Sequence, residues 1–476
     1  MERRLLPAAI GLVGITALAG LGPANAQRPP AAVSPNELAT SVQDGFTIAT
    51  VGDLILGSPQ STETDPAFQG VLKLIRDADA ATGNYEGNII DGRHFRGSGA
   101  GGFGAPPEVA KDLKAMGWDL VARSNNHAGE YGYDGFLETN RHLDEAGVVY
   151  AGAGESYAAA RAARFVSTAR GRVGLVSTAT SFAAAIVAEP ARGEYPGRGG
   201  QSALRYTRIF VMPEDSWQAV KTIYDRFPNG TGWYGPTNNT ENEITILGER
   251  FRKAAAGVTK PSYTYTLNQT DLRDVTAAVT EGKHRSDFIS VAIHAHQFAD
   301  AAGGERGPNT PETRDLDTNP SVADFLPVFA KATIDAGADV IQGTGVHVLR
   351  GIEIYKGRPI FYGLGEFFRQ MDIVGLSGMG AVGRGDENSP PIKYESIVAV
   401  SRFDKGQLAE VRLYPVQLTD DGVRMAHRGV PRLASAATAQ RILTRLQKLS
   451  QPFGTSIAIE GNIGVIRTAS RTNSGD

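Results

Sequence analysis

The sequence lacks cysteine and has few histidines: among its 476 residues there are 0 Cys and 8 His. The absence of cysteine excludes a disulfide framework, a thiolate zinc site, an iron–sulfur cluster and a thiolate nucleophile. Any transition metal must therefore be held by histidine, carboxylate or amide side chains, or by water. With so few histidines, each one can be examined in its sequence context.

The chain also lacks a strong charge of either sign. It carries 48 basic and 51 acidic residues, a net charge of −3, so its composition gives no indication of a nucleic-acid partner. Hydrophobic residues make up 41% and charged residues 21%, which is typical of a globular protein rather than a disordered one. The length predicts roughly two to three domains, or one large α/β domain with insertions.

The N-terminus has the organisation of an export signal. An Arg pair precedes an uncharged apolar stretch over 5–22, and an Ala-Asn-Ala sequence at 24–26 matches a signal-peptidase site. Residues 1–26 are therefore predicted to be a cleaved signal peptide of the general secretory or twin-arginine route, followed by a Pro/Ala/Ser-rich linker over 27–45. An uncleaved anchor is the alternative, but the stretch is short and contains proline and glycine. No later apolar run is long enough to span a bilayer, so the mature protein is expected in the periplasm or outside a bacterial cell.

Apolar, strand-like runs alternate with helix-like segments through most of the chain. This pattern predicts an α/β core over 46–420. The stretch 182–285 interrupts the alternation, is rich in aromatic and polar residues, and is predicted to be an insertion that forms a cap. Residues 421–476 are predicted to form a C-terminal helix and tail that pack on the core. Within the core, the Ala-rich stretch 157–170 is predicted to be one helix.

Polar side chains follow several predicted core strands at their carboxyl ends. In open α/β sheets the ligand crevice lies off these ends, so side chains from different strands meet there. The set combines carboxylates, an amide and imidazoles, which suits Mn²⁺, Zn²⁺ or Fe²⁺, and two such ions would clamp a phosphoryl or carbonyl group. For each residue the structural alternative is a turn-capping carboxylate or a buried, hydrogen-bonded imidazole. The residues are Asp53, Glu86, Asn126, His127, His294, His296 and His347.

The same clusters carry a resemblance to a known family. The matching stretches are Thr50–Leu56 (TVGDLIL), Asn84–Glu86 (NYE), Ser124–Ala128 (SNNHA), Leu204-Arg205, Ile293-His294 and, most specific, 343–367 (GTGVHVLRGIEIYKGRPIFYGLGEF). Over 46–370 the chain resembles the CapA family of poly-γ-glutamate capsule biosynthesis proteins. The resemblance implies a calcineurin-like metallophosphoesterase fold, a two-sheet αββα sandwich with the site at one edge.

The resemblance also implies roles for individual residues. Asp53 and His127 are expected to be catalytic, with His127 as the acid for the leaving group. Arg205 and Glu366 are expected to bind substrate, with Arg205 neutralising an anionic group and Glu366 adding a carboxylate. The chain departs from the family pattern at Ile55, where metallophosphoesterases usually carry a histidine, and at 343–347, where one or two imidazoles are missing. The expected cofactor is therefore one or two divalent ions (Mn, Zn or Fe), held by Asp53, Glu86, Asn126, His294, His296 and His347.

Three functions agree with these residues. The first is a metal-dependent hydrolase of phosphoester or amide bonds in the metabolism of poly-γ-glutamate, capsule or another envelope polymer. The second is a non-catalytic component that binds an anionic polymer and works with a capsule-synthesis membrane complex. The third is a metal-independent acid–base enzyme that acts on a peptide-like substrate. The retained Asp53, Asn126 and His127 favour the first function, and the missing imidazoles favour the second.

Overall fold

The computed structural model describes residues 40–97, 101–226, 239–299, 321–370, 391–419 and 424–468. The predicted signal peptide (1–26) and the predicted linker up to residue 39 lie outside the described residues. The described part is a mixed α/β fold with several sheets, which confirms the predicted α/β class. None of the described helices is both long and apolar enough to cross a bilayer.

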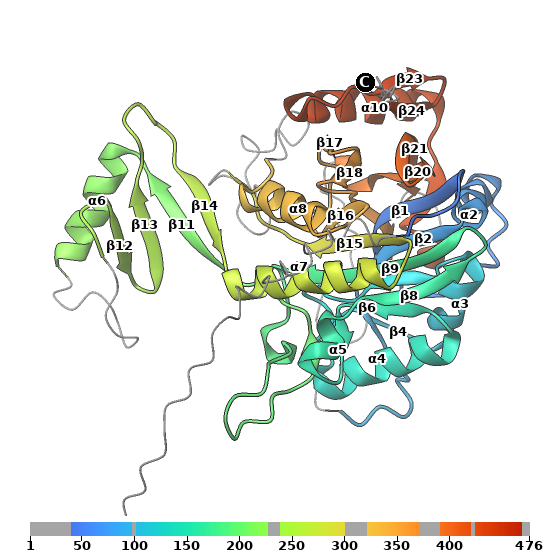
Figure 1. Ribbon diagram of the computed structural model, residues 1–476, viewed down its shortest axis with the longest axis horizontal. Helices are drawn as coiled ribbons and strands as arrows, with labels where there is room; N and C mark the ends of the chain where they lie inside the picture. The colour runs from blue at the N-terminus through green and yellow to red at the C-terminus, as the bar shows by residue number, and fades with distance from the viewer. Residues whose placement is uncertain are drawn as a thin grey trace, which may run out of the picture.

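Two large sheets form the body of the molecule (Figure 1). The first runs in the order β23 (Ala458–Glu460), β24 (Ile463–Arg467), β21 (Gln407–Thr419), β20 (Glu395–Asp404), β1 (Phe46–Ile55), β2 (Ala80–Tyr85), β5 (Leu120–Ala122) and β6 (Val149–Ala151). Two further strands join it, β19 (Glu366–Arg369) beside β1 and β22 (Val430–Leu433) beside β21. The second sheet runs in the order β17 (Ile352–Tyr355), β18 (Arg358–Phe361), β16 (Val340–Thr344), β15 (Phe288–His294), β9 (Gly171–Ala179) and β8 (Arg164–Thr168).

The two sheets share a core, and helices cover their outer faces. Along β15, Phe288 and Ala292 face the core between the sheets, while Ile289, Val291 and Ile293 face the opposite side, as the two-residue period of a strand requires. Those three side chains pack with α7 (Gln269–His284) and α8 (Phe325–Asp335). The outer face of the first sheet packs with α2 (Pro66–Asp77), α3 (Glu108–Met116) and α4 (Gly132–Ala146). The body is therefore built of four layers.

The parallel strands of both sheets end at one common edge. In the first sheet β1, β2, β5 and β6 are parallel, and in the second β9, β15, β16 and β18 are parallel. Hydrogen bonds join the two sheets there: Gln342 Nε2 donates to the Val51 carbonyl (2.9 Å), and the Gly345 N–H donates to Asp53 Oδ2 (3.0 Å). The carboxyl ends of strands far apart in the sequence therefore meet, as a ligand crevice of an α/β protein requires.

The Ala-rich stretch 157–170 is not one helix, so that prediction is wrong. Helix α5 covers only Tyr157–Arg161, and β8 (Arg164–Thr168) follows it and pairs antiparallel with β9. The side chain of Phe165 packs against the core cluster on the outer face of the second sheet. Alanine favours a helix locally, but pairing with β9 and burial of an aromatic ring stabilise the extended form more.

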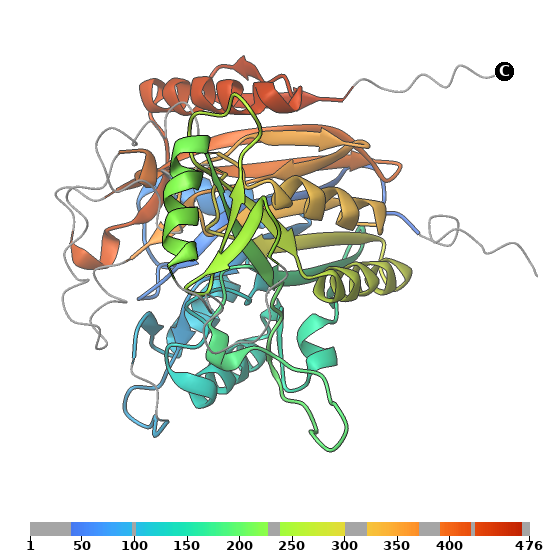
Figure 2. The ribbon, with the colours of Figure 1, turned by 90° about the vertical axis from the view of Figure 1, so that its left-hand side faces the viewer.

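The segment 182–285, predicted as an insertion, divides into distinct parts. A separate sheet forms from β12 (Glu243–Ile246), β13 (Glu249–Lys253), β11 (Tyr206–Met212) and β14 (Ser262–Leu267), together with α6 (Glu214–Asp225). This inserted sheet projects from the body in Figure 1 and stands in front of it in Figure 2. By contrast, α7 lies within 182–285 but packs on β9 and β15, so it belongs to the body.

The C-terminal residues complete the first sheet. Strands β22 and β24 both pair with β21, and α10 (Ala436–Ser450) packs against β21, β17 and β24. The Ser435 side chain caps this helix by accepting a hydrogen bond from the Thr438 N–H (3.3 Å).

Candidate functional site

Asp53 lies in β1 at the common edge where the parallel strands end, and it is fully buried. Its Oδ1 accepts a hydrogen bond from Asn84 Nδ2 (2.7 Å), its Oδ2 accepts one from the Gly345 N–H (3.0 Å), and His294 Nδ1 lies 3.6 Å from Oδ1. Burial opposes ionisation, but the hydrogen bond and charge of His294 outweigh it and hold the pKa of Asp53 below its ordinary value. Asp53 is therefore a carboxylate held in one place by partners from three elements.

The backbone around Asp53 allows an unusually close approach of two chain segments. A Cβ atom at Gly52 would lie 1.8 Å from the carbonyl oxygen of Gly365, so only glycine is accommodated there. The Asp53 N–H donates to that same carbonyl (3.1 Å). On the facing loop, His347 has a φ of 62°, a left-handed conformation that is uncommon for a residue with a side chain. Such backbone features concentrate at functional sites.

His294 and His296 lie together at the end of β15. His294 Nε2 lies 2.8 Å from Asn126 Oδ1 and 3.0 Å from His296 Nε2, and its Nδ1 lies 3.1 Å from Thr344 Oγ1. Burial lowers the pKa of His294, and burial with the neighbouring His294 lowers the pKa of His296 well below its ordinary value. Both imidazoles are therefore neutral near pH 7, the form in which histidine binds metals.

Glu86 follows β2 and is 1% exposed, yet neither of its carboxylate oxygens has a hydrogen-bond partner among the described residues. His127 Nε2 and His294 Nε2 lie 3.5 Å and 3.7 Å from Oε1. Burial, followed by the charges of Asp53 and Glu366, raises the pKa of Glu86 well above its ordinary value. A buried carboxyl group with unpaired oxygens is unusual in a folded protein, because it forgoes the hydrogen bonds that water would supply.

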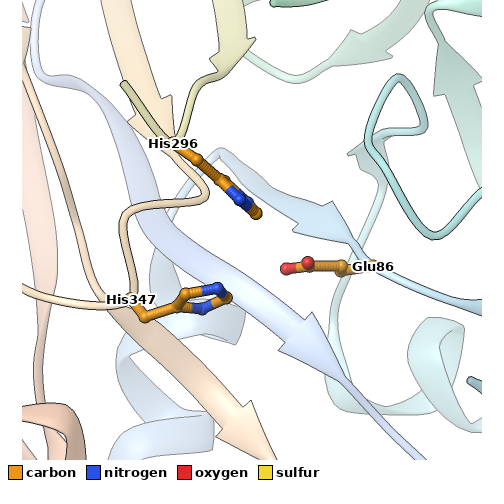
Figure 3. Close-up of side chains that lie close together, drawn as sticks. All are labelled: Glu86, His296 and His347. Atoms are coloured by element: carbon orange, nitrogen blue, oxygen red, sulfur yellow. The ribbon is translucent and has the colours of Figure 1, made fainter. Parts of the chain in front are cut away.

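Glu86 is shared by two groups of side chains that could hold a cation. In Figure 3 its carboxylate faces His296 and His347, and the ligand atoms of these three residues lie within 4.8 Å of one another. The ligand atoms of Asp53, Glu86 and His294 meet the same limit. The combined set holds two carboxylates and three imidazoles, donors that suit Mn²⁺, Zn²⁺ or Fe²⁺.

His127 lies at the rim of the cluster with its ring fixed on two sides. Its ring stacks on Phe103, with centroids 3.9 Å apart and planes 3° from parallel, and its Nδ1 lies 2.7 Å from Glu130 Oε1. The second oxygen of Glu130 accepts a hydrogen bond from the Phe103 N–H (2.5 Å). The sequence analysis missed Glu130, although a carboxylate three residues after a candidate histidine is a visible signal.

Glu366, at the start of β19, already has counter-charges within the chain. It is 1% exposed and forms an ion pair with Arg369, and His347 Nδ1 lies 2.8 Å from its Oε1 without hydrogen-bond alignment. Burial opposes ionisation, but the charge of Arg369 outweighs it and lowers the pKa of Glu366 to about 2. The sequence analysis missed Arg369, which has the same three-residue spacing from Glu366.

The structure brings most of the predicted site residues together, but it offers no ligand at position 55 and places Arg205 in another ion pair. Ile55 packs in the protein interior with Phe103, so no ligand replaces the histidine that the family pattern usually has there. Arg205 pairs with Asp271 through Nε and Nη2 (both 2.7 Å) instead of contacting the cluster residues. The residues that meet at the strand edge are Asp53, Glu86, Asn126, His127, His294, His296, His347 and Glu366.

A protein-family model described as bacterial capsule synthesis protein PGA_cap matches residues 47–307 and 317–371, well over half of the chain. The chain belongs to this family. The residues of this chain that match the PGA_cap model include all eight residues that meet at the strand edge. The predicted resemblance to the CapA proteins is therefore confirmed.

Relatives of the chain fall into two ranges of similarity. An uncharacterized protein of Sinorhizobium fredii (strain NBRC 101917 / NGR234) is 41% identical over 461 residues, which cover 90% of this chain and 94% of that protein. The capsule biosynthesis protein CapA of Bacillus anthracis is 23% identical over 330 residues, 68% of this chain and 59% of that protein. A probable polyglutamine synthesis accessory protein of Mycobacterium tuberculosis is 25% identical over 269 residues, 56% of this chain and 50% of that protein.

Proposed function

We propose that this member of the PGA_cap family is an exported, metal-dependent hydrolase that acts on an anionic envelope polymer such as poly-γ-glutamate. The supporting observation is Glu86, whose two buried oxygens have no hydrogen-bond partner among the described residues and which shares its candidate ligand groups with the imidazoles of His294, His296 and His347. A divalent cation would supply the missing partner and restore the charge of this carboxylate. Two relatives, a capsule biosynthesis protein and a probable polyglutamine synthesis accessory protein, support the class of polymer by their names.

We also infer that the body has the calcineurin-like metallophosphoesterase architecture. Its two sheets share one core, helices cover both outer faces, and the candidate ligands gather at one edge. These features support the inference, because that architecture presents its metal ligands on loops after parallel strands.

The residues that would hold the metal are Asp53, Glu86, His294, His296 and His347, with the Asn126 carbonyl oxygen beside them. When bound, a Mn²⁺, Zn²⁺ or Fe²⁺ ion would ionise a water molecule and polarise the bond to be cleaved. The hydrogen bonds from Asn84 and Gly345 hold the Asp53 carboxylate in place for this role. Glu366 lies beside His347, with its Oε1 2.8 Å from Nδ1.

His127 is the residue that we propose as general acid. Glu130 holds Nδ1 and the Phe103 ring fixes the plane of the imidazole, so Nε2 is directed toward Glu86 and the candidate metal site. A proton held on Nε2 would then pass to the leaving group of a substrate bound there. The side chain is 19% exposed, which leaves it accessible from solvent.

The proposal is tested on protein purified without chelators. Elemental analysis is expected to show bound Mn, Zn or Fe, and hydrolysis of a phosphodiester or of a γ-glutamyl oligomer is expected to rise when Mn²⁺ is added. Glu86→Gln is expected to lose the ion, whereas Glu145→Gln, at an exposed pair with Arg141 on α4, is expected to keep it. Protein that holds no ion, and whose activity Mn²⁺ does not raise, would contradict the proposal.

A second candidate is a non-catalytic component that binds the polymer for a capsule-synthesis membrane complex. The observation that favours it is Ile55, a buried apolar side chain that packs with Phe103 at the position where the family pattern usually has a histidine ligand. Retained binding of a γ-glutamyl oligomer with no hydrolysis in the presence of any of the three metals would favour this role. Hydrolysis that persists after complete metal removal would instead favour the metal-independent acid–base enzyme.

Export is part of the proposal, and it rests on the sequence pattern of residues 1–26. The expected result is a mature protein that begins at Gln27 in the periplasmic or secreted fraction of an expressing bacterium. N-terminal sequencing of that fraction measures it directly. Retention of the uncleaved chain in the membrane fraction would show an anchor instead.

A further inference from the structure

A pocket of about 430 Å³ lies where the inserted sheet meets the body. Arg208, Glu249 and Arg250 line it from the inserted sheet, and Thr180 and Arg205 line it from the side of the body. Its volume is in the range of small-molecule sites, large enough for one or two residues of a polymer. None of these lining residues belongs to the candidate metal site.

The pocket adjoins the candidate metal site through direct hydrogen bonds. The Thr180 N–H donates to the carbonyl oxygen of His294 (3.0 Å), and Thr180 Oγ1 donates to Gln297 Oε1 (2.6 Å). The side-chain amide of Gln297, which is 1% exposed, also donates to the Tyr206 hydroxyl on β11 (3.1 Å). The wall of the pocket, the loop that carries His296 and the root of the inserted sheet are therefore one hydrogen-bonded unit.

The residues that line the pocket carry more positive than negative charge. Three arginines and one glutamate line it, a balance of 3 − 1 = +2, and each of these arginines also forms an ion pair. The side chains of the three arginines that line the pocket are between 27% and 44% exposed, so they reach solvent. The pairs are Arg161 and Arg205 with Asp271, Arg250 and Arg252 with Glu243, and Arg208 with Glu249.

The lining arginines are held in position before any ligand arrives. Arg208 lies over the rings of Phe210 and Tyr263, at 4.8 Å and 5.6 Å from their centroids. Arg205 binds Asp271 through two side-chain nitrogens and through its own backbone N–H. Side chains already fixed in this way lose less conformational entropy when an anion binds.

We propose that this pocket is a substrate subsite that binds an acidic group on the polymer segment next to the bond held at the candidate metal site. The acidic group is a carboxylate or a phosphate, the anions that the planar guanidinium fork binds with two parallel hydrogen bonds. The place of this subsite relative to the reaction rests on the proposed function, whereas anion binding in the pocket does not. The inserted sheet thereby selects for acidic substrates, and Arg208 and Arg250 are its specificity residues.

The test measures binding of a γ-linked pentaglutamate, and separately of inorganic phosphate, to the metal-depleted full chain. Arg208→Gln and Arg250→Gln are each expected to weaken pentaglutamate binding about tenfold, which corresponds to about 1.4 kcal/mol. Arg252→Gln is the matched control, since Arg252 shares Glu243 with Arg250 and lies two residues along the same strand but does not line the pocket. Its affinity is expected to stay within about twofold of the wild type. Arg250→Lys, which keeps the charge and loses the fork, is expected to fall between the two.

Each outcome decides the proposal. Binding of both probes that is unchanged in Arg208→Gln and in Arg250→Gln, or equally weakened in Arg252→Gln, overturns it, as does a wild type that binds neither probe. If the variants weaken only phosphate binding, the subsite stands and the acidic group is a phosphate. Circular dichroism of each variant checks that the inserted sheet still folds. Because metal-depleted protein is used, failure of the hydrolase proposal would leave these binding results unaffected.

Discussion

On one side of β1 lies Glu86, which follows β2, and on the other lies Glu366, the first residue of β19. Both are 1% exposed. The region around Glu366 supplies Arg369 and His347, and the pKa of Glu366 falls to about 2, whereas Glu86 has no hydrogen-bond partner among the described residues and its pKa is raised. Burial alone therefore does not decide whether a carboxyl group is charged. Within the described residues, the chain pairs the Glu366 carboxylate with a cation and gives the Glu86 oxygens no hydrogen-bond partner.

The same substitution on the two sides of β1 is expected to have very different effects on stability. Glu366→Gln leaves the guanidinium of Arg369, which is 8% exposed, without its carboxylate, and is expected to lower the free energy of unfolding by about 3–5 kcal/mol. Glu86→Gln removes an unpaired buried carboxyl group, so metal-free protein is expected to lose no stability. Urea unfolding of both variants measures the difference. Equal losses in the two variants would remove the contrast.

The stability difference between wild type and Glu366→Gln is expected to depend on pH. The pKa of Glu366 lies at about 2 in the folded chain, below its ordinary value of 4.5, so its contribution is fully present above pH 4.5 and is lost as the pH falls toward 2. The shift of 4.5 − 2 corresponds to about 3 kcal/mol. Urea unfolding of metal-free protein at several values of pH measures it. A difference that stays constant across this range would show that the carboxylate charge is not what stabilises this region.

Stabilisation by Mn²⁺ is expected to be reduced more by Glu86→Gln than by Glu366→Gln, the reverse of their order in metal-free stability. Mn²⁺ should raise the thermal midpoint of the wild type, because a ligand of the folded state stabilises it by mass action. Glu86→Gln is expected to bind Mn²⁺ at least about tenfold more weakly, a loss of about 1.4 kcal/mol of that stabilisation. Glu366→Gln should lose less Mn²⁺ affinity, because Glu366 would act on the metal only through His347. Titration of the midpoint with Mn²⁺ measures both, and an equal response of the two variants would contradict the assignment of Glu86 as a ligand.

The smallest effect is expected at an exposed ion pair that otherwise resembles the pair at Glu366. Glu460 pairs with Arg467 in the C-terminal hairpin, and the Arg467 hydrogen bond lowers the pKa of Glu460. Because both side chains are about half exposed, solvent screens the pair, and Glu460→Gln is expected to leave the urea midpoint unchanged within error. A measurable loss here would show that charge pairing, rather than burial, sets the stability of such pairs.

Much of the body could be predicted from local patterns, because strand and helix periods are properties of short segments. The α/β class, predicted from the alternation of strand-like and helix-like segments, is confirmed. The helix predicted over 157–170 is wrong, since pairing of β8 with β9 overrides the preference of alanine. Local patterns also could not predict where the inserted sheet ends. The sequence of α7 has an ordinary amphipathic pattern, and only its contacts with β9 and β15 show that it belongs to the body.

The sequence by itself determined which residues stand at the ends of the strands, because their order along the chain and the parallel topology bring Asp53, His294 and His347 to one edge. Only the tertiary structure decided their chemistry. Burial and the charges of Asp53 and Glu366 raise the pKa of Glu86, whereas the charge of Arg369 outweighs burial and lowers the pKa of Glu366. Asp53 and Glu366 both lie far from Glu86 in the sequence. The pairing of Arg205 with Asp271 likewise appears only in three dimensions. Ionisation follows burial and neighbouring charge, and neither is a property of a short segment.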